Sequence, residues 1–202
     1  MQMREQLQAD PRDSQKGKMY AAERSLGWWE QPEDFLRFKD LARFVRRLPN
    51  SKRFQKMFPE FKHYGEFKLI ERHHGGGACA DANELVFRPG SWRRWLVIHE
   101  FAHTVHKREM KRGARIGEVK DPRFRNDISG YTQGHGWRYA QIYLKLILWF
   151  LGRAEHDRLK AAFKAGRVRY KTPRKMSPEQ RAAAAIRLAK IRPNANYFRL
   201  AA

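Results

Sequence analysis

The sequence predicts an α+β fold that is mostly helical, with a small antiparallel sheet or hairpin in the first half of the chain. Several segments repeat apolar residues every three or four positions, which is the spacing of one helix face. Two short runs rich in β-forming residues flank the glycine-rich stretch "HHGGGACADAN", as strands joined by a loop do. Hydrophobic residues make up 42% of the 202 residues, and this proportion is enough to form a buried core.

The first half of the chain contains an extension, two helical segments and the two strand-like runs. We expect residues 1–31 to form a flexible N-terminal extension. A helix is predicted for 32–48, because its apolar residues share one face, with acidic residues in the first turn and arginines in the last. A short helical piece follows at 51–58. The runs "EFKLIERH" and "ELVFRPG" are predicted to pair as strands, and the second could offer an edge to an extended substrate.

The second half of the chain is predicted to be helical apart from one long loop. A long helix is expected to begin at a Ser91 cap and to end at Gly113. Residues 113–134 show no periodicity, and a connection of this length is typically functional or mobile. Helices are then predicted in "HGWRYAQIYLKLILWFLG", "RAEHDRLKAAFKAG" and "SPEQRAAAAIRLAKI". We therefore divide the rest of the chain into a domain at 32–152 and a basic helical C-terminal extension at 153–202.

The charge balance is the most unusual bulk property. Lys and Arg number 43 against 21 Asp and Glu, so the formal net charge is +22. Such an excess predicts attraction to polyanions, nucleic acid first and an acidic membrane surface second. Cys79 is the only cysteine, which excludes an internal disulfide and a Cys-rich zinc module.

The sequence has no feature that directs it to a membrane. Its N-terminus lacks the apolar run of a signal peptide, and no apolar run is long enough to span a bilayer. We expect an intracellular protein of the cytoplasm, nucleoid or nucleus, without a membrane partner.

Residues His99 to His103 form the pattern H-E-x-x-H. Residues four apart on a helix project from the same face, so both imidazoles can bind one metal ion, as in catalytic zinc sites. Glu100 lies at the neighbouring edge of this face and is a candidate general base toward metal-activated water. The alternative is an ordinary amphipathic helix in which both histidines make structural hydrogen bonds.

A catalytic zinc ion needs a third protein ligand, and three residues compete for this role. His106 lies on the same face, but about 10 Å beyond His99 along a straight helix. The pattern H-E-x-x-H-x-x-G-x-x-H also fails, because His106 occupies the position of the glycine. Glu118, in the following segment, is an alternative. We favour His135, which lies between two glycines at the start of a predicted helix.

Three segments carry a resemblance to a known family: "GGACADANELVFRPG", "LVIHEFAH" and "GHGWRY", in this order. Together they resemble the SprT-like zinc metalloproteases, which include the Spartan-type proteases of DNA–protein crosslinks, over about residues 64–150. The resemblance implies a zincin-like fold, a single Zn²⁺ ion and hydrolysis of a protein substrate in DNA repair. It also implies the site residues: His99, His103 and His135 as zinc ligands and Glu100 as the general base.

The chain also departs from this family. The segment between the second and third histidines is longer than expected, with a basic insert at 107–130, and the Cys-rich zinc module is missing. Tyr139 occupies the aromatic position of the last motif. Tyr131 and His106 are candidates for a donor that stabilises the oxyanion of the transition state or supports the ligands.

Basic residues are concentrated in two regions, 36–58 and 152–202. Residues 36–58 hold 8 Lys or Arg against 1 acid, and 152–202 hold 14 against 3, so both are expected to contact the phosphates of single-stranded or duplex DNA. The interleaved phenylalanines of 36–58 have helical spacing, which favours core packing over stacking on bases. The predicted nucleic-acid contacts are Arg46, Arg47, Lys52, Arg53, Arg167, Arg169, Lys171, Arg174 and Lys175.

Two other functions are compatible with the same residues. One is a nucleic-acid-binding or structural protein that keeps a residual zinc site. The other is a phage or maturation-type peptidase whose activity is not coupled to DNA. Glu100 argues against the first of these, because a purely structural zinc ion does not need a general base.

Overall fold

The computed structural model describes residues 15–59, 61, 65–74, 77–115 and 134–171, and isolated positions between 177 and 186, with the side chains of 111–115 left out. The chain divides into two compact units, Met1–Lys171 and Thr172–Ala202, and every element discussed below belongs to the first. These elements are α1 (Lys16–Ser25), α2 (Phe38–Arg47), η1 (Leu48–Asn50), α3 (Lys52–Met57), β1 (Lys68–Glu71), β2 (Cys79–Ala80), β3 (Glu84–Phe87), α4 (Arg94–Arg115), α5 (Trp137–Phe150) and α6 (Arg153–Ala165). This content of helices and one small sheet confirms the α+β class.

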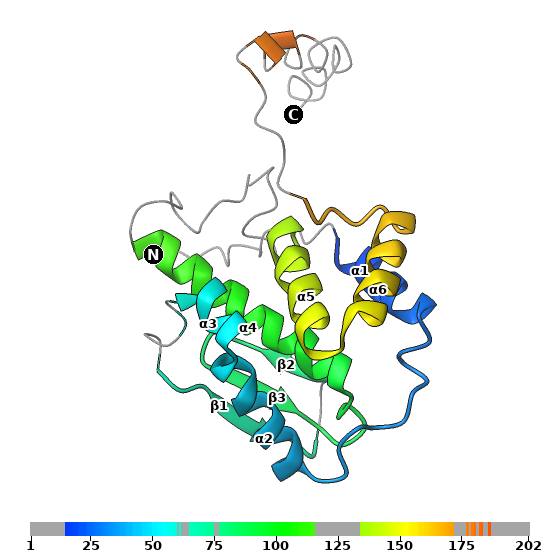
Figure 1. The fold of residues 1–202 in the computed structure, drawn as a ribbon, viewed down its shortest axis with the longest axis vertical. Coiled ribbons are helices and arrows are strands. Elements are labelled where there is room, and N and C mark those ends of the chain that lie inside the picture. Colours follow the sequence, from blue (N-terminus) through cyan, green and yellow to red (C-terminus); the bar gives the residue numbers. More distant parts are fainter. Residues whose placement is uncertain are drawn as a thin grey trace, which may run out of the picture. The chain divides into compact units, whose positions relative to one another are not determined.

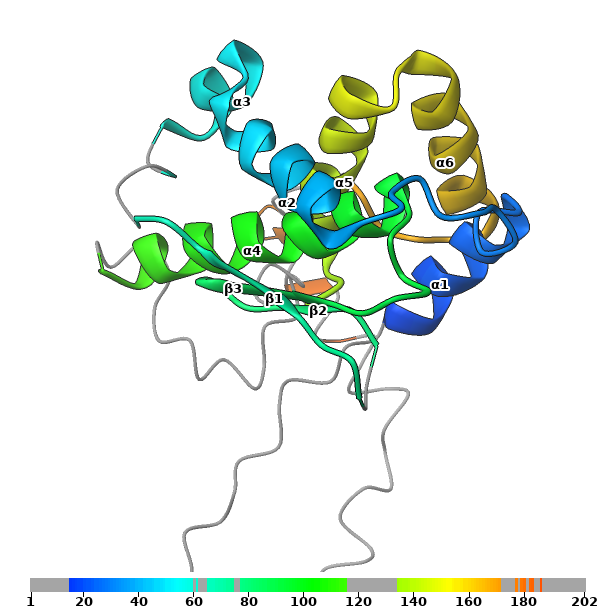
Figure 2. The ribbon, with the colours of Figure 1, turned by 90° about the horizontal axis from the view of Figure 1, so that it is seen from below.

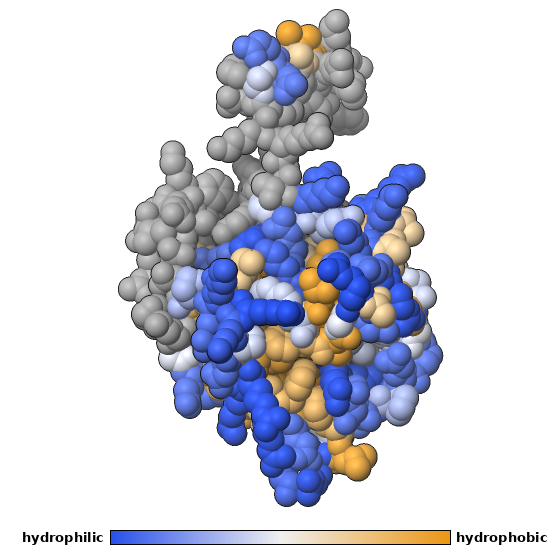
Figure 3. Space-filling view, viewed as in Figure 1, coloured by the Kyte–Doolittle hydropathy of each residue, from blue (hydrophilic) through white to orange (hydrophobic). Residues whose placement is uncertain are grey.

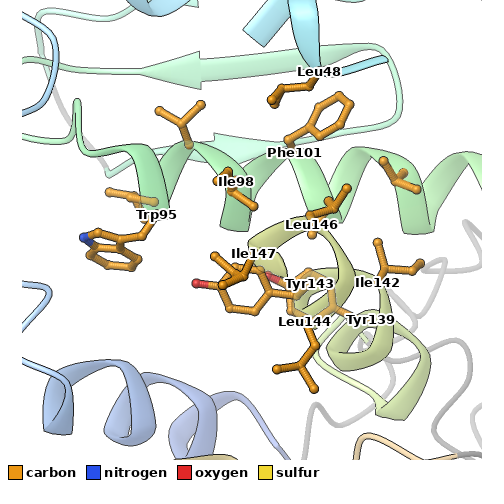
Figure 4. Close-up of a cluster of buried hydrophobic side chains, with 14 of the residues drawn as sticks. Leu48, Trp95, Ile98, Phe101, Tyr139, Ile142, Tyr143, Leu144, Leu146 and Ile147 are labelled. Atoms are coloured by element: carbon orange, nitrogen blue, oxygen red, sulfur yellow. The ribbon is translucent and has the colours of Figure 1, made fainter. Parts of the chain in front are cut away.

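Helix α4 lies at the centre of the first unit. The sheet packs along one of its sides and α5 along another (Figures 1 and 2). Figure 4 shows Phe101 of α4 beside Leu48 on the side of the sheet, and Tyr143 and Leu146 of α5 on the opposite side. All four of these side chains are buried or nearly so. The apolar spacing of the "WLVIHEFAHTV" segment therefore serves two neighbours at once, which explains why this helix has almost no solvent-facing side at its centre.

The sheet is mixed rather than antiparallel. Its strand order is β1-β3-β2, with β1 parallel to β3 and β2 antiparallel to β3. The prediction that the "EFKLIERH" and "ELVFRPG" runs pair antiparallel is thus wrong, because the glycine-rich stretch between them contains β2. A short turn at 81–83 folds β2 back on β3, so that β1 is left with the other edge of β3. Since β3 is the central strand, it offers no edge to a substrate.

The N-terminal segment is part of the core, and the prediction of a flexible extension at 1–31 is wrong for residues 15–31. Helix α1 packs against α6 (Figures 1 and 2). Met19 is fully buried, and Trp28 is 1% exposed. The Trp28 indole donates a hydrogen bond to Glu155 (2.9 Å), and its carbonyl accepts one from the Trp95 indole (2.9 Å). These partners lie far away in the sequence, so the segment becomes ordered only through tertiary contacts.

The C-terminal boundary of the domain lies after Lys171, which corrects the predicted boundary at 152. Helix α6 buries Leu159 and Phe163 completely, and Val168 beyond it is 4% exposed. The helix is therefore part of the folded unit. Four of its exposed positions are basic, Arg153, Arg158, Lys160 and Lys164, which made the whole region look like a solvated extension.

The start of α4 is held by the N-terminal segment rather than by Ser91. The Glu33 carboxylate accepts a hydrogen bond from the Trp92 amide (2.6 Å), and Asp34 accepts one from the Arg94 amide (2.8 Å). The hydroxyl of Ser91 instead bonds to the backbone of Arg88. The two carboxylates satisfy free amides at the positive end of the helix. At its other end α4 continues past the predicted stop at Gly113 to Arg115.

A buried arginine fastens α4 to the sheet. The Arg108 guanidinium donates hydrogen bonds to the carbonyl oxygens of Ala82 (2.7 Å), Phe61 (3.1 Å) and Gly65 (3.1 Å). One helical turn earlier, the Thr104 hydroxyl donates to the Asp81 carbonyl (2.8 Å). These bonds satisfy loop carbonyls that would otherwise be buried without a partner, and they hold the β2–β3 turn against the helix.

Candidate metal centre

Three histidines meet where α5 begins beside α4. His99 and His103 project from neighbouring turns of α4, and His135 lies two residues before α5. A nitrogen of each ring could bind a metal ion, and these nitrogens all lie within 4.8 Å of one another. His99 and His135 are buried, and His103 is half-buried. Two histidines of α4 and one from a distant segment of the chain thus form one group that could hold a metal ion.

Tyr139 holds the start of α5 against the two histidines of α4. Its hydroxyl donates a hydrogen bond to the His99 carbonyl (3.1 Å), and its ring stacks on the His103 ring with centroids 4.2 Å apart. Burial raises the pKa of Tyr139 well above its ordinary value, so the phenol keeps the proton that it donates. Gly136 caps α5 in an extended conformation, and this places His135 before the helix instead of in its first turn.

A glutamate that the sequence did not single out completes the surroundings of His99. The Glu23 carboxylate on α1 is fully buried and lies 2.7 Å from the His99 Nδ1 atom. Because Nδ1 is engaged, Nε2 is the free nitrogen of this ring, and it is buried with no hydrogen-bond partner among the described residues. An imidazole whose other nitrogen donates to a carboxylate is the usual form of a metal-binding histidine. The residues present therefore fit a metal ion.

A sequence signal for Glu23 existed in a segment that looked flexible. Met19, Ala22, Glu23 and Leu26 have the i, i+3, i+4, i+7 spacing of one helix face,. A glutamate in the middle of an apolar face is unusual, because a carboxylate is rarely buried without a partner. The identity of that partner, 76 residues away in the sequence, could not be read from the spacing.

Helix α1 also touches His135. The side-chain amide of Gln15, the residue before α1, donates hydrogen bonds to the carbonyls of His135 (3.0 Å) and Arg169 (3.3 Å). The Tyr20 ring stacks on His99 with centroids 5.6 Å apart and meets the His135 ring edge-on at 5.4 Å. Two of the three histidines are thus supported by the same helix.

Burial dominates the electrostatics of the group. It lowers the pKa of His103 well below its ordinary value, and the charges of the neighbouring histidines act in the same direction, so this imidazole keeps a free lone pair at neutral pH. Burial also lowers the pKa of His99, but the Glu23 and Glu100 carboxylates raise it, with a net increase. Burial raises the pKa of Glu100, although His99 opposes the shift. When both are ionised, Glu23 and Glu100 carry two negative charges, which a divalent cation would balance.

The remaining predicted site residues lie elsewhere or outside the described residues. His106 is fully buried on α4, with its ring 6.3 Å from that of Tyr139, and it is not part of the three-histidine group. Tyr131 and Glu118 fall outside the described residues, as do Arg174 and Lys175. The other predicted nucleic-acid contacts are all exposed: Arg46, Arg47, Lys52, Arg53, Arg167, Arg169 and Lys171. Figure 3 shows a mostly hydrophilic face around an apolar strip.

A separate cavity lies away from the histidines. Its volume is about 700 Å³, and its lining includes Arg46, Phe54, Phe58 and Phe61 but no residue of the three-histidine group. Phe54 and Phe61 pack on Phe101 of α4, with ring centroids 5.5 and 5.7 Å apart. The cavity therefore belongs to the phenylalanine cluster between α3 and α4, and the chemically distinctive groups are gathered at the histidines.

Comparisons with models of known protein families, with curated proteins and with solved structures found no match. Among the described residues, no helix is both long and apolar enough to cross a membrane. The fold and the site define an α+β protein with a three-histidine group that could bind a metal ion.

Proposed function

We propose that this protein is a zinc-dependent metallopeptidase that hydrolyses peptide bonds in nucleic-acid-associated proteins. The observation that carries the proposal is the group of His99, His103 and His135 with Glu100 next to the first ligand in the sequence. Three imidazoles that leave one coordination position open are a typical ligand set for catalytic zinc. The resemblance of "LVIHEFAH" and "GHGWRY" to SprT-like proteases supports the same ligands and a zincin-like fold.

Each residue of the group has a distinct role in the proposed reaction. When bound, Zn²⁺ would act as a Lewis acid that lowers the pKa of water and polarises the scissile carbonyl. Glu100 accepts a proton from the attacking water and passes it to the leaving amine. Burial raises the pKa of Glu100 above that of an exposed glutamate, and this makes the carboxylate a better proton acceptor. Tyr139 keeps His103 in place through ring stacking.

The choice of substrate rests on charge. The chain carries a formal net charge of +22, and the exposed arginines and lysines of α2, α3 and 167–171 are available to phosphates. A basic protein concentrates on DNA at low and moderate salt. A peptidase held there would meet proteins that are bound or crosslinked to DNA, which is consistent with a role in DNA repair.

A cleavage assay tests this function. The zinc-loaded protein is incubated with a basic DNA-binding protein, with and without single-stranded DNA, beside the Glu100→Gln and Glu109→Gln variants. We expect fragments from wild type that increase with DNA and disappear in Glu100→Gln. Glu109→Gln is the matched control, because Glu109 lies on the same helix and pairs with Arg138, outside the histidine group; it should cleave as wild type does.

Two outcomes would redirect the proposal. A folded, zinc-replete wild type that produces no fragments would favour a binding protein with a residual zinc site. Cleavage that is independent of DNA would favour a peptidase that is not coupled to nucleic acid.

A further inference from the structure

Glu23 is the deepest carboxylate near the histidine group. It has no exposed surface, and the His99 ring that it contacts is fully buried as well. Removing a carboxylate from water is unfavourable unless a cation or strong donors compensate for the lost hydration. In this fold Glu23 lies 2.7 Å from the His99 Nδ1 atom, and the buried Tyr143 hydroxyl also interacts with its carboxylate. The position of Glu23 is therefore tied to a histidine nitrogen of the group.

We propose that Glu23 is a positioning residue of the metal centre, which holds His99 with Nε2 as its metal-binding nitrogen. This inference rests on the metal centre proposed above. A carboxylate that accepts the Nδ1–H of His99 selects the tautomer whose lone pair is on Nε2, and it prevents rotation of the ring. Nε2 is the buried nitrogen that has no hydrogen-bond partner among the described residues, which is the state expected of a nitrogen reserved for a metal ion.

The inference makes α1 an integral part of the metal centre. Gln15 bonds to the carbonyl of His135, and Tyr20 packs on the rings of both His99 and His135. Together with Glu23, these contacts connect one short helix to two of the three histidines. Binding of a metal ion to the assembled group should therefore stabilise the docked form of α1, since a ligand that binds only the assembled state favours it.

The competing explanation is that Glu23 and His99 form a purely structural buried pair. In that case Glu23→Gln would change the stability of the metal-free protein, whereas the folded variant would bind metal as wild type does. A positioning role predicts a loss of metal affinity in the folded variant. Metal binding, measured apart from stability and activity, separates the two explanations.

The test compares four full-length proteins: wild type, Glu23→Gln, Glu23→Asp and Glu155→Gln. Zn²⁺ affinity is measured by competition with a chromophoric chelator, and the ligand field by the absorption bands of the Co²⁺ forms. Glu155→Gln is the matched control, because the Glu155 carboxylate also tethers the N-terminal segment through Trp28, and it pairs with Arg158 instead of with a member of the three-histidine group. Circular dichroism of each metal-free protein establishes that it is folded.

We expect Glu23→Gln to lower the Zn²⁺ affinity by about 10- to 100-fold, which is the range for residues that support a metal ligand. Its Co²⁺ bands should shift, Glu23→Asp should recover part of the affinity, and Glu155→Gln should bind as wild type. A folded Glu23→Gln variant with wild-type affinity and bands would overturn the inference. Failure of wild type itself to bind Zn²⁺ would instead reject the metal centre.

If Glu23→Gln does not fold, hydrogen exchange of wild type decides the question. Zn²⁺ should slow amide exchange in α1 more than in α2, which contributes no residue to the three-histidine group. Equal exchange in α1 with and without Zn²⁺ would overturn the role of Glu23.

Discussion

The two sides of α4 are built on opposite principles. On the side of α3 and the loop before β1, Phe101 packs against the rings of Phe54 and Phe61. On the side of α1 and α5, the same helix places His99 and His103 beside buried polar groups. The apolar side gains free energy from burial, whereas the histidine side buries groups that favour water. One helix thus combines a stabilising face with a face that buries polar groups at an energetic cost, which the proposed metal ion would offset.

The largest effect is expected from a substitution on the apolar side of α4. Phe101→Ala removes a fully buried ring and should lower the free energy of unfolding by about 3–5 kcal/mol. Urea denaturation of the metal-free protein measures it. Glu100→Gln, one residue away on the helix, serves as the control and should not reduce stability, because it removes a buried charge. Comparable losses in the two variants would contradict the division of α4 into two faces.

The next largest effect is expected on metal affinity, from a substitution in the three-histidine group that leaves the apolar side of α4 unchanged. His135→Ala should reduce Zn²⁺ affinity by about 100-fold or more, since it removes a ligand and not merely a support for one. Isothermal titration or chelator competition measures the affinity. His106→Asn tests the alternative third ligand on α4 itself. If His106→Asn lost more affinity than His135→Ala, the assignment of the three-histidine group would be incorrect.

A smaller effect on stability is expected at Arg108, a buried charged residue of α4 outside the three-histidine group. Arg108→Leu leaves the carbonyls of Ala82, Phe61 and Gly65 without their donor. We expect a loss of about 2–3 kcal/mol in the free energy of unfolding, with Zn²⁺ affinity unchanged. The neighbouring Lys107 bonds to Ala80 at a part-exposed position, and Lys107→Met should cost less than about 1 kcal/mol. A fall in metal affinity in Arg108→Leu would show that the two faces are coupled.

Deletion of the C-terminal region should affect the folded first unit least, and its expected effect is on DNA binding. Deletion of 172–202 removes 7 Lys or Arg and 1 acid and leaves the first unit intact. DNA affinity should fall, and the slope of log affinity against log salt should flatten by about 0.9 for each lost phosphate contact on duplex DNA. Fluorescence anisotropy at several salt concentrations measures both quantities. An unchanged slope would exclude residues 172–202 from the DNA contacts.

The sequence predicted structure best where it depended on residues close together in the chain. The i, i+4 spacing of His99 and His103 requires only helical geometry, and a helix was assured by the apolar residues around them. The glycines on both sides of His135 similarly indicated a residue at the start of a helix, and the structure places it two residues before α5. By contrast, pairing of β1 with β3 depended on a two-residue strand inside a glycine-rich stretch, and a segment that short carries no periodic signal.

By itself, the sequence determined which residue types are available to the site and how they are spaced along each helix. It determined the excess of positive charge and the motif on α4 as well. Only the tertiary structure decided that α1 is ordered, that β1 lies parallel to β3, and that Glu23 meets His99. The physical reason is that helical spacing follows from backbone geometry within a few residues. The partner of a buried carboxylate, however, depends on the packing of elements that are far apart in the chain.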